Sequence, residues 1–176
     1  WVGINFANAG ANPLFNSDYS ELRLDSWVQE YVEIPEGTTS IGAYAFYNYD
    51  LLREITIPAS VQSIGVQAFE GCDNLEYIHL PDSVEIIRAE AFMDCVSLQE
   101  FDYPMNWTEA TFDWSTYDLF RGCESLTEIV VPEGVAVMPN GAFAGSDCLE
   151  KATLPSTLKG LSESAFADCP NLVEIE

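Results

Sequence analysis

Residues 52–74, LREITIPASVQSIGVQAFEGCDN, are one copy of a unit that recurs through most of the chain. The most regular marker of the unit is a proline that follows an apolar residue, at Pro35, Pro58, Pro81, Pro104, Pro132 and Pro155. The intervals between these prolines are 23, 23, 23, 28 and 23 residues. Repetition at a fixed period of roughly 20 to 50 residues indicates one supersecondary unit stacked on copies of itself. The sequence therefore predicts a repeat solenoid.

The unit contains a short strand and a compact turn. Residues 55–57, Ile-Thr-Ile, show the period-2 alternation of a half-buried strand. Pro58 has no N–H to donate to a ladder, so it belongs at the end of the strand. Val61 and Ile64 form a second short apolar pair. The segment 68–72, Ala-Phe-x-x-Cys, is too short for a regular helix, and we expect a single helical or 3₁₀ turn there.

Apolar positions recur in register from unit to unit. The leucine column has no exception: Leu52, Leu75, Leu98, Leu126, Leu149 and Leu172. Stacking buries such columns as continuous ladders, with successive strands paired in parallel about 4.8 Å apart. We therefore predict an α/β repeat solenoid, right-handed, with short parallel strands on one face and short strand, 3₁₀ or helical turns on the other.

The pattern L-x-x-I-x-[IL]-P, followed by V-x-x-I-x-x-x-A-F-x-x-C, resembles the BspA-type (Treponema pallidum-type) leucine-rich repeat family. The resemblance covers the chain from about residue 30 to the end. It implies a leucine-rich repeat fold in a bacterial surface protein associated with adherence to host or matrix proteins and to other bacteria. It transfers no catalytic or ligand-binding residue, because the matched columns are core positions.

The resemblance leaves the first part of the chain unmatched. We read residues 1–30 as an N-terminal cap or degenerate repeat, and residues 31–176 as the solenoid, with a longer repeat at 104–131 and one domain overall. The chain begins at Trp1 without a signal segment, and it stops within the strand of a repeat. We therefore expect a fragment of a longer protein, in which a further repeat or a cap follows residue 176.

The formal net charge is −23, from 29 acidic and six basic side chains. Such a field repels phosphate backbones, so nucleic acid and anionic membrane surfaces are not expected partners. No apolar run reaches the roughly 18 residues of a membrane span, so we expect no membrane insertion. The acidity suits a protein outside the cell or one that meets basic partners, and it also fits a solvated surface with no charge-based role.

Four cysteines share one repeat position, three residues after the repeat phenylalanine: Cys72, Cys95, Cys123 and Cys169. Their spacings of 23, 28 and 46 do not resemble the close ligand pairs of zinc sites. Stacking would bring neighbouring sulfurs together without the crossed geometry of a disulfide. We predict a buried column of free thiols, with a disulfide or a metal site as the alternative.

Catalytic residues are scarce. His79 is the single histidine, and the chain has neither G-x-S-x-G nor a glycine-rich phosphate loop. Carboxylate pairs occur, so counting alone leaves a glycosidase-type dyad open. The acids could also attract Ca²⁺ weakly, but no D-x-D-x-[DN]-G loop provides a dedicated site. We expect no enzymatic activity, no cofactor and no metal site.

The first candidate binding surface is the outward face of the predicted strands. It has two columns: Glu54, Tyr77, Glu100, Glu128, Lys151 and Glu174, then Thr56, His79, Asp102, Val130, Thr153 and Glu176. We predict that a partner binds the first four residues of the first column and the first three of the second: Glu54, Tyr77, Glu100, Glu128, Thr56, His79 and Asp102. Tyr77 and His79 stand in an acidic strip, and aromatic and mixed polar groups of this kind serve as interface anchors. The alternative is a solvated sheet face.

The second candidate lies in the repeat that is five residues longer than the others. Residues 105–117 contain Trp107, Phe112, Trp114 and Tyr117. Insertions in repeat proteins bulge out as loops, often on a binding face, and exposed rings mark interaction sites. Alternatively, Trp107 or Trp114 folds back to fill the gap in the irregular repeat, which we expect for at least one of the two rings.

These features predict a non-catalytic recognition module of a cell-surface or secreted bacterial protein. The expected partner is a protein or a glycan, including components of host extracellular matrix. One alternative is a structural spacer that presents a neighbouring domain. Another is a specificity module attached to an enzyme elsewhere in a longer protein.

Overall fold

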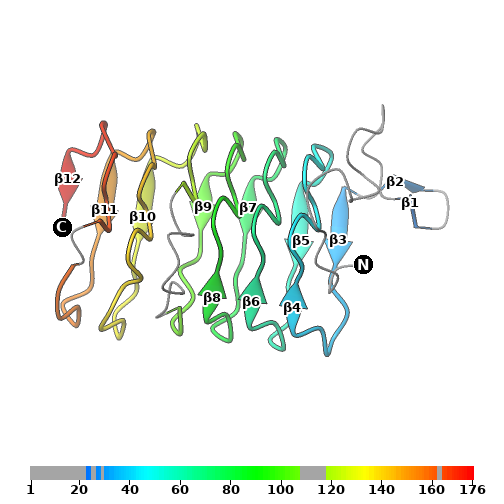
Figure 1. Ribbon diagram of the computed structural model, residues 1–176, viewed down its shortest axis with the longest axis horizontal. Coiled ribbons are helices and arrows are strands. Elements are labelled where there is room, and N and C mark those ends of the chain that lie inside the picture. Colours follow the sequence, from blue (N-terminus) through cyan, green and yellow to red (C-terminus); the bar gives the residue numbers. More distant parts are fainter. Residues whose placement is uncertain (1–22, 25–26, 29, 108–117, 162–163) are drawn as a thin grey trace.

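The computed structural model describes residues 23–24, 27–28, 30–107, 118–161 and 164–176. Figure 1 shows these residues as a row of stacked coils that runs from blue at the N-terminus to red at the C-terminus. One face of the stack carries β3 (Tyr31–Glu33), β5 (Glu54–Thr56), β7 (Tyr77–Ile78), β9 (Glu100–Phe101), β10 (Glu128–Val130), β11 (Lys151–Thr153) and β12 (Glu174–Ile175). We call this face the strand face.

Strands of successive repeats pair in parallel on the strand face. The pairs are β3 with β5, β7 with β9, and β10 with β11 and then β12. Val32 lies beside Ile55, and Ile129 lies beside Ala152, in each case 23 residues on. In β3, β5 and β10 the central residue is buried and its two neighbours are exposed, which is the expected alternation. The predicted parallel solenoid is confirmed.

A second, smaller sheet lies on the opposite side of the stack. It joins β4 (Ser40–Ile41), β6 (Ser63–Ile64) and β8 (Ile86–Ile87), again in parallel. The equivalent position in the next repeat falls within residues 108–117, outside the described residues. The short apolar pair therefore forms the expected second strand in three units, whereas the described residues 133–140 and 156–161 of the later units contain no strand.

The Ala-Phe-x-x-Cys segment is a hydrogen-bonded turn, and the described residues contain no helix. The reason is a pair of left-handed residues four positions apart, such as Gln67 (φ 52°) with Gly71 (φ 70°) and Glu90 (φ 58°) with Asp94 (φ 57°). Left-handed dihedrals interrupt a right-handed helix after less than one turn. The chain is therefore a β-solenoid, and the helical component of the predicted α/β class is absent from its described part.

Stacked phenylalanines form the centre of the core. Neighbouring rings in the series Phe46, Phe69, Phe92, Phe120, Phe143 and Phe166 are nearly parallel, with centroids 5.2 to 5.6 Å apart. Phe120 takes its place in this column even though five extra residues separate it from the preceding proline. Ring pairs at this separation add to the stabilisation from burial. The longer repeat thus keeps the core in register.

The cysteine column has the predicted structure for its central members. Cys72, Cys95 and Cys123 are buried free thiols. The Sγ atoms of Cys72 and Cys95 donate to the carbonyl oxygens of Phe46 and Phe69, at 3.2 and 3.1 Å. Burial raises the pKa of each of these three thiols well above its ordinary value. They are core groups that help to join successive coils.

Thiol labelling of the folded protein is expected to modify only Cys148 and Cys169, the two half-buried cysteines. Desolvation raises the pKa of both thiols, so their labelling should become faster as the pH rises and the thiolate fraction grows. Mass spectrometry after iodoacetamide treatment would locate the modified residues. The Cys148→Ser, Cys169→Ser double variant is the control and should react only after unfolding. Native modification of Cys95 would contradict the buried column.

Two short strands lie within the segment predicted as an N-terminal cap, residues 1–30. β1 (Arg23–Leu24) and β2 (Trp27–Val28) pair antiparallel, unlike the strands that follow. Residues 1–22 lie outside the described residues, so the boundary of the cap stays a prediction. In the described part of the chain, no helix is long and apolar enough to cross a membrane.

Candidate binding surface

The strand face brings most of the predicted binding residues together. Glu54, Tyr77, Glu100 and Glu128 occupy equivalent outward positions of β5, β7, β9 and β10, and Tyr77 lies beside Glu100. Thr56 is likewise exposed at the end of β5. Tyr77 is 46% exposed, which is high for an aromatic ring. The sequence columns are therefore real columns in space.

Basic groups on this face bridge adjacent coils. Arg53 lies 3.4 Å from carboxylate oxygens of both Glu30 and Glu76. Lys151 Nζ lies 2.9 Å from Glu174 and 2.8 Å from Glu176. Arg53 and Lys151 lie toward the two ends of the stack, so neither of them pairs with the acids at its centre.

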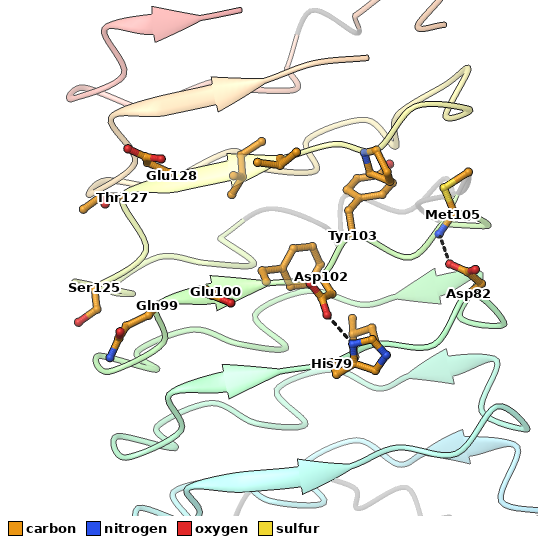
Figure 2. Close-up of a pocket in the computed structure, with 15 residues that line it drawn as sticks. His79, Asp82, Gln99, Glu100, Asp102, Tyr103, Met105, Ser125, Thr127 and Glu128 are labelled. Atoms are coloured by element: carbon orange, nitrogen blue, oxygen red, sulfur yellow. Dashed lines mark hydrogen bonds and ion pairs between the residues drawn. The ribbon is translucent and has the colours of Figure 1, made fainter. Parts of the chain in front are cut away.

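At the centre of the face, the Nδ1 atom of His79 contacts the Asp102 carboxylate of the next coil (Figure 2). Both side chains are mostly exposed. Glu100 and Glu128 form no ion pair among the described residues. The centre of the strand face therefore keeps uncompensated negative charge.

The sheet of the strand face is broken between β5 and β7, where Glu76 N still donates to Arg53 O at 3.4 Å, and it is interrupted more completely between β9 and β10. Elsewhere Thr127 O accepts from Glu150 N at 2.8 Å, and Val131 N donates to Thr153 O at 2.9 Å. Among the described residues, no backbone hydrogen bond joins the coil of residues 99–122 to the coil of residues 127–145. The interruption falls at the repeat that is five residues longer.

A groove of about 890 Å³ opens at this interruption. Figure 2 shows Glu100, Asp102, His79 and Glu128 around it, carried by the coils of β7, β9 and β10. Ser125 and Thr127 line one end, and Asp82 and Met105 line the other. Phe101, Tyr103 and Ile129 are buried residues that reach it from the core side. The groove therefore combines an apolar floor with an acidic rim, and its size is within the usual range of ligand sites.

Trp107 belongs to the core, so its prediction as a surface binding residue is wrong. Its side chain is fully buried, and its ring centroid lies 5.1 Å from Tyr103, 6.1 Å from Phe101 and 6.3 Å from Phe143. Tyr103 OH donates to Trp107 O at 3.2 Å, and burial raises the pKa of this tyrosine. Trp107 thus fills the space in the irregular repeat, which was the alternative expected for at least one ring.

The other three aromatic candidates of the longer repeat, Phe112, Trp114 and Tyr117, lie outside the described residues. The sequence patterns also missed residues that the structure adds to the surface. Tyr31 on β3, 62% exposed, lies beside Glu54 and was in neither column. Val130, 61% exposed, lines the groove; it was in the second outward column but not among the predicted binding residues. Extending the outward column one repeat upstream would have found Tyr31. The 28-residue interval between Pro104 and Pro132 indicated where the repeat is irregular, but it did not indicate which residues line the groove there.

The arrangement offers little for catalysis or metal binding. No group of three or more His, Cys, Asp or Glu side chains in the described part of the chain is placed to hold a metal ion. The His79 and Asp102 side chains are 80% and 59% exposed, unlike the desolvated acid and base groups of active sites.

Parallel strands on one face, turns on the other and an aligned core of Leu, Ile and Phe define a leucine-rich repeat solenoid. Residues 26–113 and 116–176 match six copies of the BspA type Leucine rich repeat region. The chain belongs to the BspA-type leucine-rich repeat family. A search of curated proteins finds no match.

Three solved structures are similar to this chain. The crystal structure of the T. pallidum leucine-rich repeat protein is 35% identical, with a TM-score of 0.67 over 82% of this chain and 68% of that one. A leucine-rich repeat protein from Bacteroides ovatus is 29% identical, with a TM-score of 0.54 over 83% of this chain and 45% of that one. A leucine-rich cell surface protein from Faecalibacterium prausnitzii is 26% identical over 83% of this chain and 59% of that one, with a TM-score of 0.44.

Proposed function

We propose that the chain is a non-catalytic recognition module of a bacterial cell-surface or secreted protein, and that it binds a protein partner at the groove between β9 and β10. The observation that carries the proposal is the groove itself, which opens where the repeat departs from its period. At the next junction, between β10 and β11, a backbone ladder closes the corresponding space. An interruption that keeps the core in register while exposing an apolar floor is typical of a binding site.

Two further features support the binding of a protein partner. BspA-type proteins are associated with adherence, which suits host or matrix proteins as partners and leaves a surface glycan as an alternative ligand. The exposed ring of Tyr77 lies on the same face as the groove, one strand before β9. Tyrosine supplies a large contact area at low entropic cost and is enriched at the centres of interfaces.

Capture by immobilised matrix proteins and glycans tests this proposal. The Tyr77→Ala, His79→Ala double variant is expected to weaken capture about tenfold or more, because it removes an interface anchor beside the groove. Both side chains are exposed, so the thermal unfolding midpoint should stay unchanged. Surface plasmon resonance with the folded chain would measure both affinity and rate.

Tyr31→Ala is the matched control, because Tyr31 is an exposed tyrosine on the same face but far from the groove. It should leave capture unchanged. An equal loss with Tyr31→Ala would place the interface on the whole strand face. No capture of any matrix protein or glycan would favour the structural spacer instead.

A further inference from the structure

We infer that the N-terminal half of the strand face binds a proline-rich, basic protein segment in the polyproline II conformation. The segment lies along the axis of the solenoid, across β3, β5, β7 and β9. The inference goes beyond the proposed function, because this site depends on Tyr31 as well as on Tyr77 and does not include the groove. Two properties of the face support it: the spacing of its two exposed tyrosines and the charge of the residues that alternate with them.

Tyr31 and Tyr77 stand two coils apart in one outward column. Tyr31 lies beside Glu54, and Tyr77 lies beside Glu100. Backbone hydrogen bonds join the residues that come just before these four: Arg53 N to Glu30 O at 2.8 Å, Glu76 N to Arg53 O at 3.4 Å, and Gln99 N to Glu76 O at 2.9 Å. The four coils are therefore stacked in register, as Figure 1 shows for β3, β5, β7 and β9. Two strand spacings place the tyrosines roughly 10 Å apart.

This separation matches the repeat of a polyproline II helix. The helix has three residues per turn and rises about 3.1 Å per residue, so every third side chain returns to the same edge after about 9 Å. A β-strand returns to the same edge after roughly 7 Å and does not match. Prolines three residues apart would meet Tyr31 and Tyr77 in turn, and these rings are 62% and 46% exposed. Aromatic side chains are the usual contacts of such segments, whose preformed backbone loses little entropy on binding.

Carboxylates alternate with the tyrosines and favour a basic segment. Glu54 lies between Tyr31 and Tyr77 in the column, and Glu100 follows Tyr77. Both acids are exposed, and neither forms an ion pair among the described residues. Lys or Arg between the prolines of the segment would reach them. The net charge of −23 adds to this preference, since it attracts basic segments and repels acidic ones.

The face also offers donors for the backbone of the segment. A polyproline II helix has no internal hydrogen bonds, so its carbonyl groups remain free to accept. The hydroxyl groups of Tyr31, Tyr77 and Thr56 belong to exposed side chains of the strand face and can donate to these carbonyls. The face therefore suits the rings, the charges and the backbone of one kind of segment.

The probe is a fluorescent nonapeptide, Pro-Pro-Lys repeated three times, and fluorescence anisotropy with the folded chain measures its binding. Two matched peptides control for conformation and charge. Gly-Gly-Lys repeated three times carries the same charge on a flexible backbone, and Pro-Pro-Glu repeated three times keeps the conformation with the opposite charge. The Pro-Pro-Lys peptide is expected to bind, and each control to bind at least about tenfold more weakly.

Single variants of the protein locate the site. Tyr31→Ala and Tyr77→Ala are each expected to weaken binding of the Pro-Pro-Lys peptide about tenfold. The thermal unfolding midpoint should stay unchanged, because both side chains are exposed. Tyr31→Phe and Tyr77→Phe keep the rings and should lose clearly less. The matched control is Val130→Ala, which shortens an exposed side chain of the same face beyond the interruption and should change binding little.

Two double variants separate the column from the overall charge. Glu54→Gln, Glu100→Gln is expected to weaken binding of the Pro-Pro-Lys peptide about fivefold. The control, Glu85→Gln, Glu124→Gln, removes the same charge from exposed sites outside the strands of this face and should change binding little.

Equal loss in the two double variants would overturn the inference, because it would show attraction by diffuse charge. Equal binding of the Gly-Gly-Lys peptide would overturn it as well, and so would capture of a neutral polysaccharide through both tyrosines without peptide binding. If the peptide does not bind while matrix capture depends on Tyr77 but not on Tyr31, the inference fails and the proposed function stands. If the peptide binds through both tyrosines and no matrix protein is captured, the inference stands and the proposed function fails.

Discussion

Gly65→Ala is expected to lower the free energy of unfolding by about 3 kcal/mol or more, the upper part of the range for overpacked cores. A Cβ atom at this position would contact Ala43 N, and it would lie 2.7 Å from Gly42 C and 2.8 Å from Ala43 Cα. All three atoms are backbone atoms of the preceding coil, which cannot rotate aside as a side chain can. The Gly65 N–H also donates to Ile41 O at 2.9 Å, so the coils cannot separate without losing this bond.

Urea unfolding followed by circular dichroism would measure the effect. Gly160→Ala is the matched control, because that glycine is exposed, and a Cβ there would meet no atom within 4 Å. This variant should stay within about 0.5 kcal/mol of the parent. Equal unfolding midpoints for the two variants would contradict the close approach of the coils at Gly65.

Trp107→Ala is expected to cost about 3 to 5 kcal/mol, the usual loss for truncating a fully buried large aromatic residue. The indole ring packs against Tyr103, Phe101 and Phe143, and so supports both the apolar floor of the groove and the central column of the core. The cavity left by alanine would lie beneath the groove. Thermal unfolding would report the loss of stability, and capture by matrix proteins at low temperature would report the loss of the floor.

Trp107→Phe is the control for this position. It keeps an aromatic ring and removes the indole N–H, which is buried without an acceptor among the described residues. Its cost should therefore be clearly smaller than that of alanine. If alanine and phenylalanine unfold alike, or if alanine has no effect, Trp107 does not fill the irregular repeat as described.

The sequence predicts the stack well because each core column is a one-dimensional pattern. Leu52 and Ile55 are followed at the same interval by Leu75 and Ile78, and the structure buries all four. The cysteines at the same interval were predicted as buried thiols by the same argument. Register follows directly, since parallel strands of identical units align equivalent residues.

The turns and the groove were harder to predict, for different reasons. Gln67 and Glu90 adopt left-handed dihedrals that these residue types rarely take, so their sequence gives no sign of the turn that replaces a helix. The interruption between β9 and β10 depends on hydrogen bonds between distant residues, which a repeat length does not specify. The extra length showed where the period fails, and it predicted that Trp107 or Trp114 would turn inward, but it showed neither which of the two would do so nor that the sheet is interrupted there.

The phenylalanine column has a mechanical consequence at the same place. A pull along the axis of the solenoid is opposed at the neighbouring junction of β10 and β11 by backbone hydrogen bonds. Between the coils of β9 and β10, the described contacts that oppose it are mainly side-chain contacts, including the rings of Phe120 and Phe143 at 5.5 Å and the bond from Gly122 N to Asp147 Oδ1 at 3.1 Å. Apolar stacking yields more gradually under load than a ladder of directional bonds. The junction of β9 and β10 is therefore also the compliant joint of the rod.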